Sequence, residues 1–227
     1  MRSAIAGGLF SVVMMASTAH ATTNIALGAT VVANSTSVTY GDGGNPSAIV
    51  DGITGDSTTG SGVSYWVGQD YQFGNTETGY VTIDLGGTYN ITGFTLTDTH
   101  NAQYFDRGTK DFVIGVGASA SDALLNATGG NAAATSAFSL TQWQQLTDLT
   151  VGTSATGRYV TFYALTDWSN DPNAPGGDGT SAWPTRSAGL SELQVAGTLV
   201  SAVPEPISMA ILGTGLVGLL AMRRRNV

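Results

Sequence analysis

The sequence contains no cysteine, and only two of its 227 residues are histidine. Disulfide bonds therefore cannot stabilise the fold, and no thiolate is available to hold zinc or to attack a substrate. Lysine and arginine together number only eight. Residues 22–202 contain four basic and fifteen acidic side chains, a net charge of about −11. Such a surface repels phosphate backbones, which argues against a nucleic-acid partner, and it is compatible with calcium and with neutral glycans.

Signatures of catalysis are equally scarce. The only histidine after residue 21 is His100, and no nucleophile-elbow motif accompanies it. Pairs of carboxylates occur throughout so acidic a chain, and they do not single out a glycosidase site. We therefore expect a protein that is not an enzyme, and a hydrolase of unknown type is the third alternative after the two binding functions considered below.

The first 21 residues are typical of a signal peptide. Arg2 supplies the positive charge, residues 4–16 form an apolar stretch too short to span a bilayer, and Ala19–Ala21 is a small-x-small cleavage site. A buried N-terminal helix is the alternative. Export would leave one domain over residues 22–200, which is large enough to bury a core without disulfides.

The chain ends in three consecutive features over residues 203–227. A proline-rich break is followed by the apolar, uncharged run 207–222 and then by three arginines. This arrangement resembles the PEP-CTERM sorting signal of Gram-negative bacteria, whose motif is Val203, Pro204, Glu205 and Pro206. The resemblance implies recognition by an exosortase and delivery to the cell surface or to extracellular polysaccharide. Residues 207–222 would form a transmembrane helix in the inner membrane before processing. A plain C-terminal anchor is the alternative.

Between these ends, apolar and polar residues alternate in several short runs, which is typical of strands with one buried face. No segment has sustained helical periodicity, and the nearest is a single turn over residues 121–126. We expect an all-β fold, a jelly-roll β-sandwich, with surface loops over 118–139 and 169–185. Trp143 is expected in a strand and in the core. The alternating apolar residues are Val81, Ile83 and Leu85, then Phe94 and Leu96, then Phe112, Ile114 and Val116, and finally Leu193 and Val195.

Several segments resemble, in order, the F5/8 type C or discoidin-like domains. The resemblance covers about residues 24–197 and implies a galactose-binding-like jelly roll, the fold of many carbohydrate-binding modules. The matching segments are Asn24–Ala26, Ala48–Gly52, Trp66, Val81–Gly86, Arg158–Val160 and Gly189–Val195.

Asp51 and Asp56 flank a tight glycine turn, a pattern found both in calcium loops and in plain turns. In the F5/8 type C family, a structural calcium ion often links the first loop to the last strand. The resemblance therefore implies carboxylate ligands from Asp51, Asp56 and Glu192, with Ser57 or Thr58 as alternatives to Asp56. Backbone carbonyl ligands would come from Ala48, Ile53 and Ser191.

A polar and aromatic loop, residues 98–110, offers side chains for sugar binding. In the resembling family, ligands are contacted by loops at one end of the barrel. The candidates here are His100, Asn101, Tyr104 and Arg107, with Trp66 or Trp168 as the aromatic platform. For Arg107, an ion-pair network with Asp106 and Asp98 is the structural alternative.

The tryptophans differ in their expected positions. Trp66 is also a candidate for the core, whereas Trp168 and Trp183 flank an Asp/Pro/Gly-rich loop and are the better surface candidates. Taken together, the sequence predicts an exported, non-catalytic glycan-binding module at the cell surface or in the extracellular matrix. The alternative prediction is a structural or adhesion protein that uses the same fold without a defined sugar site.

Overall fold

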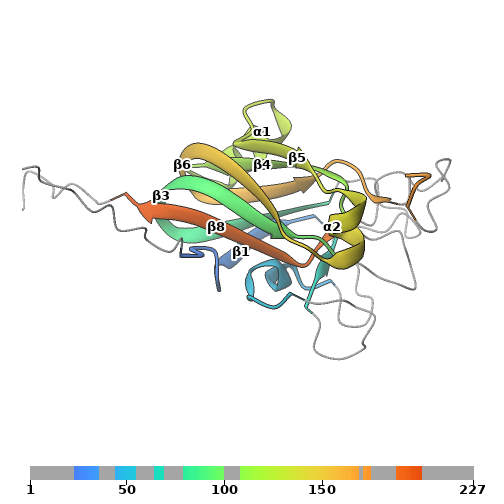
Figure 1. The fold of residues 1–227 in the computed structure, drawn as a ribbon. Coiled ribbons are helices and arrows are strands. Elements are labelled where there is room, and N and C mark those ends of the chain that lie inside the picture. Colours follow the sequence, from blue (N-terminus) through green and yellow to red (C-terminus); the bar gives the residue numbers. More distant parts are fainter. Residues whose placement is uncertain are drawn as a thin grey trace, which may run out of the picture.

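Strands are the main secondary structure in the part of the chain that the computed structural model describes, namely residues 23–35, 44–54, 64–68, 79–99, 108–168, 171–174 and 188–200. The elements are labelled in Figure 1. In chain order they are β1 (Thr30–Asn34), the 3₁₀ helix η1 (Pro46–Val50), β2 (Trp66–Val67), β3 (Tyr80–Thr97), β4 (Asp111–Gly117), α1 (Ala120–Thr128), β5 (Ala134–Ala137), α2 (Leu140–Gln145), β6 (Leu149–Ala164), β7 (Gly189–Leu190) and β8 (Glu192–Leu199).

Two long strands determine the architecture. β3 and β6 pair antiparallel along almost their whole lengths, and the register breaks between Asp84 and Tyr89 of β3. Gly86 lies in this break with φ of +75°, a conformation that glycine adopts without strain. The ribbon folds over at this corner, so that the two halves of β3 lie in facing layers (Figure 1).

The folded ribbon forms both layers of a β-sandwich. β1, β4 and β5 extend the layer that contains the first half of β3, whereas β8 pairs only with its second half. Because the β3–β6 ladder continues around the corner, these strands form one sheet in the order β1-β3-β6-β4-β5, with β8 on β3. β2 and β7 form a separate two-stranded sheet. The predicted all-β jelly roll is confirmed.

The core lies between the two layers. Phe112 packs against Phe162 with ring centroids 5.5 Å apart, and both rings are fully buried. The residues that the alternation pattern predicted to face inward are all buried: Val81, Ile83, Leu85, Phe94, Leu96, Phe112, Ile114, Val116, Leu193 and Val195.

Residues 118–139 are not the surface loop that the sequence predicted. They contain α1, which extends the predicted helical turn, and β5, which pairs with β4 at the edge of the sheet. Trp143 is buried as expected, but it lies on α2 and not on a strand. Ser139 and Gln142 cap this helix reciprocally. A helix of six residues is too short to show a period in the sequence, which explains the error.

No helix among the described residues is long and apolar enough to cross a bilayer. The predicted signal peptide over residues 1–21 lies outside the described part of the chain. So do the sorting motif, Val203 to Pro206, and the apolar run 207–222.

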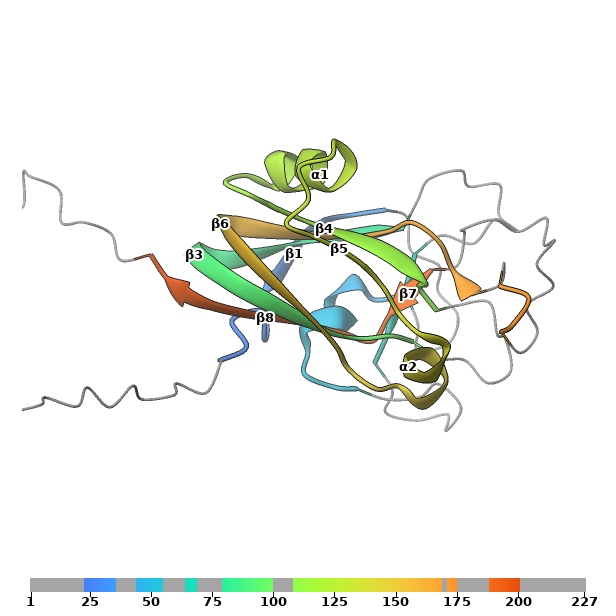
Figure 2. The same ribbon diagram turned by 45° about the horizontal axis from the view of Figure 1, so that its top comes forward.

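α1 packs closely on the outer face of β4 (Figure 2), and glycine makes this approach possible. A Cβ atom on Gly115 would lie 2.0 Å from the Ala123 carbonyl oxygen and 2.6 Å from the Ala127 nitrogen. We expect Gly115→Ala to push the helix off the sheet and to lower the free energy of unfolding by about 2 kcal/mol. Urea denaturation would measure this change.

Gly152→Ala is the matched control, because a Cβ atom on Gly152 of β6 meets nothing within 4 Å. This variant is expected to be as stable as the parent or slightly more stable, since alanine restricts the unfolded chain. Equal stabilities for the two variants would contradict the close helix–sheet packing.

Candidate functional site

Several of the described segments begin or end at one end of the sandwich, which we call the loop end. The carboxylate of Asp98 holds the flanks of segment 100–107 together, since its Oδ1 accepts hydrogen bonds from the backbone N–H of Thr99 (2.8 Å) and of Thr109 (2.9 Å). The Thr109 hydroxyl in turn donates to the Gly189 carbonyl at 2.7 Å. Segment 100–107 therefore begins and ends beside β7.

Two further described segments begin or end at the same place. The Gly68 N–H donates to the Ala188 carbonyl at 3.0 Å, which joins the flanks of segments 69–78 and 175–187. The predicted sugar-binding residues His100, Asn101, Tyr104 and Arg107 lie outside the described residues, as does Trp183.

Trp168 is not the exposed platform that the sequence predicted. Its side chain is only 3% exposed, and its ring stacks on Trp143 with centroids 5.3 Å apart. The indole Nε1–H donates to Asp98 Oδ2 at 3.1 Å, and Lys110 Nζ lies 5.7 Å from the ring centroid. The ring therefore pins the loop flanks from inside, as large aromatic side chains can.

Trp66 also belongs to the core, in agreement with the second of its two expected positions. It is fully buried and contacts Phe162 edge-on, with centroids 6.3 Å apart and planes at 88°. Each tryptophan within the described ranges, including Trp143, is thus an interior residue. An aromatic sugar platform, if it is a tryptophan, cannot be Trp66 or Trp168.

Asp98 is a residue whose importance the sequence did not reveal. The carboxylate is fully buried, and burial raises its pKa well above the ordinary value, while the hydrogen bonds from Trp168, Thr99 and Thr109 oppose that rise. All these donors are neutral. The sequence did contain one indication, because Asp98 directly follows a strand with a buried face. An acidic side chain at such a position has to find hydrogen-bond donors or remain at the surface.

Glu192 is the second buried carboxylate near this end. It begins β8, pairs with Thr97 of β3 and is 1% exposed. Its Oε2 accepts a hydrogen bond from the Gly52 N–H at 3.1 Å, whereas its Oε1 has no hydrogen-bond partner. Burial, together with the negative charges of Asp51 and Asp148, raises the pKa of Glu192 to about 7 against the opposing effect of the Gly52 hydrogen bond.

The other candidate calcium ligands surround this contact in different ways. Asp51 and Ile53 are exposed, and Asp51 Oδ1 accepts the Ile53 N–H at 2.8 Å. Ala48, in η1, and Ser191 are buried. Asp56 lies outside the described residues, and within the described ranges no three acidic or histidine side chains are grouped so as to hold a metal ion.

The chemistry of this donor set fits calcium. A buried carboxylate oxygen without a partner is costly, and a bound cation would satisfy it. Calcium takes six to eight oxygen ligands and readily combines carboxylates with loop carbonyls. The sequence did not reveal Asp148, whose Oδ1 accepts the Thr97 hydroxyl at 2.6 Å and whose charge acts on Glu192. Sequence separation conceals this neighbour, because β6 and β8 meet only through β3.

Comparison with known proteins agrees with this geometry. A family model for the PEP-CTERM protein-sorting motif matches residues 202–225. No curated protein matches the chain. Among solved structures, a fucolectin from Morone saxatilis serum is 20% identical with a TM-score of 0.52, over 78% of this chain and 49% of the fucolectin, so the chain spans about half the length of that lectin.

Two bacterial structures are similar. CBM32-3 from a family 31 glycoside hydrolase of Clostridium perfringens is 13% identical with a TM-score of 0.50, over 74% of this chain and 90% of that one. The C-terminal domain of a Bacteroides fragilis chitobiase is 18% identical with a TM-score of 0.49, over 76% and 95%. The domain shares its jelly-roll fold with the fucolectin and the C. perfringens module. This jelly roll is followed by a PEP-CTERM sorting motif.

Proposed function

We propose that this chain is an exported, non-catalytic carbohydrate-binding protein held at the cell surface or in extracellular polysaccharide. The observation that carries the proposal is the convergence of several segment ends at one end of the jelly roll, where Asp98 and Trp168 hold Thr99 and Thr109, the residues that flank segment 100–107. Rigid strands that carry variable loops are a common way to build a binding site. The fucolectin and the C. perfringens module, with the same fold, are named as a lectin and as a carbohydrate-binding module.

The sorting motif supports the location. An exosortase would recognise residues 203–206, and the apolar run 207–222 would hold the chain in the inner membrane of a Gram-negative bacterium until it is processed. The net negative charge of the domain is compatible with a neutral glycan partner and not with nucleic acid.

A calcium ion is part of the proposal as a structural cofactor. Glu192 and Asp51 would supply carboxylate oxygens, and Asp56 would supply a third. The carbonyls of Ala48, Ile53 and Ser191 are the further candidates. The unpartnered Oε1 of Glu192 is the main support for this assignment. An ion here would tie the loop after η1 to the first residue of β8, and so would stiffen one side of the loop end.

The sugar site is tested by replacing an aromatic side chain of segment 100–107. We expect Tyr104→Ala to weaken binding of the best glycan from an array by about tenfold or more, since truncating a central aromatic contact typically costs over 1 kcal/mol. Isothermal titration calorimetry on the exported domain would measure the affinity.

Tyr159→Ala serves as the matched control, because Tyr159 lies on β6 beside the corner, at the other end of the sandwich. The Tyr159→Ala variant should bind the glycan with the same affinity as the parent. A loss of affinity in both variants, or in neither, would remove Tyr104 from the site.

A structural or adhesion protein is the second candidate, and one observation favours it. Trp66 and Trp168, the two proposed platforms, are interior residues. This candidate predicts that the intact exported chain binds no glycan on the array and still associates with the extracellular matrix. Saturable binding to one glycan class would exclude it.

A further inference from the structure

β8 runs the length of the sandwich and defines its two ends. Glu192, at the start of this eight-residue strand, lies at the loop end. Leu199, at its other end, pairs with Tyr89 directly after the corner of β3. A strand rises by about 3.3 Å per residue, so the two ends of β8 are separated by roughly 23 Å. We call the end formed by the β3–β6 corner and Leu199 the corner end.

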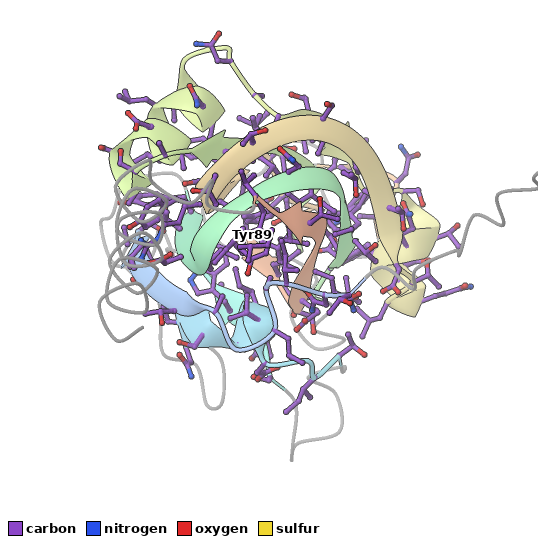
Figure 3. The ribbon with its side chains drawn as sticks, turned by 90° about the vertical axis from the view of Figure 1, so that its left-hand side faces the viewer. Tyr89 is labelled. Carbon is purple, nitrogen blue, oxygen red and sulfur yellow. The ribbon has the colours of Figure 1, made fainter. Side chains whose placement is uncertain are left out.

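The corner end has an apolar surface next to the point where the described chain ends. Leu199, the last residue of β8, is 60% exposed and Val200 is 39% exposed, whereas Leu193 and Val195 of the same strand are buried. Tyr89 is half-buried beside them, and the Val200 N–H donates to the Thr88 carbonyl at 2.8 Å. Figure 3 looks onto this end of the molecule, with Tyr89 near its middle.

The two ends of the sandwich differ in net charge. At the corner end, Arg158 forms a two-pronged ion pair with Asp84, with both N···O distances at 2.7 Å, and Asp122 of α1 lies nearby. Lys110 is the one basic residue described at the loop end. The acidic residues described at the loop end are Asp51, Asp98, Asp111, Asp148, Asp167, Asp171 and Glu192. Among the described residues, the corner end is thus nearly neutral, whereas the loop end has exposed or half-buried carboxylates at Asp51, Asp111, Asp148 and Asp171.

The length of the following chain limits the distance to a membrane. Six residues separate Val200 from Ile207, where the apolar run begins. Even fully extended, this linker reaches no more than about 25 Å. With residues 207–222 in a bilayer, the corner end is therefore held close to the lipid surface, and the loop end can be farther away by the length of β8.

We propose that the corner end rests on the lipid bilayer while the chain is retained, with Tyr89, Leu199 and Val200 in the interfacial region and the loop end pointing away. The inference rests on the proposed retention by the tail. Tyrosine and aliphatic side chains suit the membrane–water interface, and anionic headgroups repel the acidic loop end. The glycan site is then presented outward before any processing of the tail.

The absence of native cysteine permits a direct test with single labels. The exported chain with its tail is incorporated into phosphatidylethanolamine/phosphatidylglycerol vesicles that contain spin-labelled lipid. An environment-sensitive fluorophore is attached to Leu199→Cys, to Thr198→Cys or to Gln144→Cys. Thr198 is the neighbouring residue and faces the opposite side of β8, whereas Gln144 is exposed on α2 near the loop end. Vesicle flotation verifies that each variant is retained.

We expect the label at Leu199 to shift its emission to the blue and to be quenched several-fold more than the label at Thr198, with no quenching at Gln144. Equal quenching at Leu199 and Thr198 in floated vesicles would show a domain that tumbles on its linker, and would overturn the proposed contact alone. Failure of all variants to float would overturn retention by the tail, and the contact with it. Neither result depends on glycan binding, which is measured separately.

Discussion

Trp168→Ala is expected to lower the free energy of unfolding of the domain by about 4 kcal/mol, and not to remove sugar binding selectively. The indole is 3% exposed, stacks on Trp143 and donates to the buried carboxylate of Asp98. Its removal leaves a large cavity and an acceptor without its donor. Urea denaturation followed by the fluorescence of the remaining tryptophans would measure the loss.

Trp168→Phe is the informative comparison. Phenylalanine keeps most of the ring packing on Trp143 but cannot donate to Asp98, so we expect a smaller loss of about 1–2 kcal/mol. If Trp168→Ala were as stable as the parent and had lost glycan affinity, the ring would be a ligand contact, and its assignment to the interior would be wrong.

Without calcium, the stability of the domain is expected to fall as the pH rises from about 4.5 to 7. Glu192 has a folded pKa of about 7 against an ordinary value of 4.5. Below the lower value both states are protonated and there is no penalty. Between the two, the unfolded state ionises while the folded state keeps its proton, and the free energy of unfolding falls by about 3 kcal/mol in total. Above pH 7 this loss is complete.

Calcium is expected to reverse this loss, because the ion binds the ionised carboxylate in the folded state only. Chemical denaturation at several pH values, with excess calcium or with a chelator, would measure both effects. Glu192→Gln should abolish the calcium response and remove this share of the pH dependence, and subtraction of its curve separates the contribution of Glu192 from that of Asp98. Asp122→Asn, on α1, should retain both responses. If the parent protein is equally stable with calcium and with chelator, the proposed calcium site is wrong.

The sandwich was predictable because apolar residues recur every second position in its strands. Ile83 lies between Thr82 and Asp84, and a two-residue period places Ile83 and its apolar neighbours at 81 and 85 on one buried face. The helices were less predictable. α1 extends one recognisable turn, whereas α2 has six residues whose helical state depends on the Ser139–Gln142 capping box and on burial of Trp143. The bend that carries β3 from one layer into the other depends on tertiary contacts, and no local sequence pattern predicts it.

The candidate site was predictable only in part, for a physical reason. Asp51 and Glu192 were paired through a family resemblance, and the Gly52–Glu192 hydrogen bond brings their segments together. The predicted exposure of Trp168 was wrong. The polar composition of the adjoining segment is typical of solvent-exposed residues, whereas the position of the Trp168 side chain depends on Asp98, 70 residues earlier in the chain. Contacts between distant strand ends decide which of several polar or aromatic side chains are buried, and sequence spacing does not contain that information.

The position of β8 also has a mechanical consequence. A load between a glycan held at the loop end and a tail anchored beyond Leu199 would act along the axis of β8, parallel to β3. Their ladder from Thr97 and Glu192 to Tyr89 and Leu199 would then be sheared, with its hydrogen bonds stretched together, and not unzipped one at a time. In a flowing medium, the hydrogen bonds of this ladder would therefore share the load.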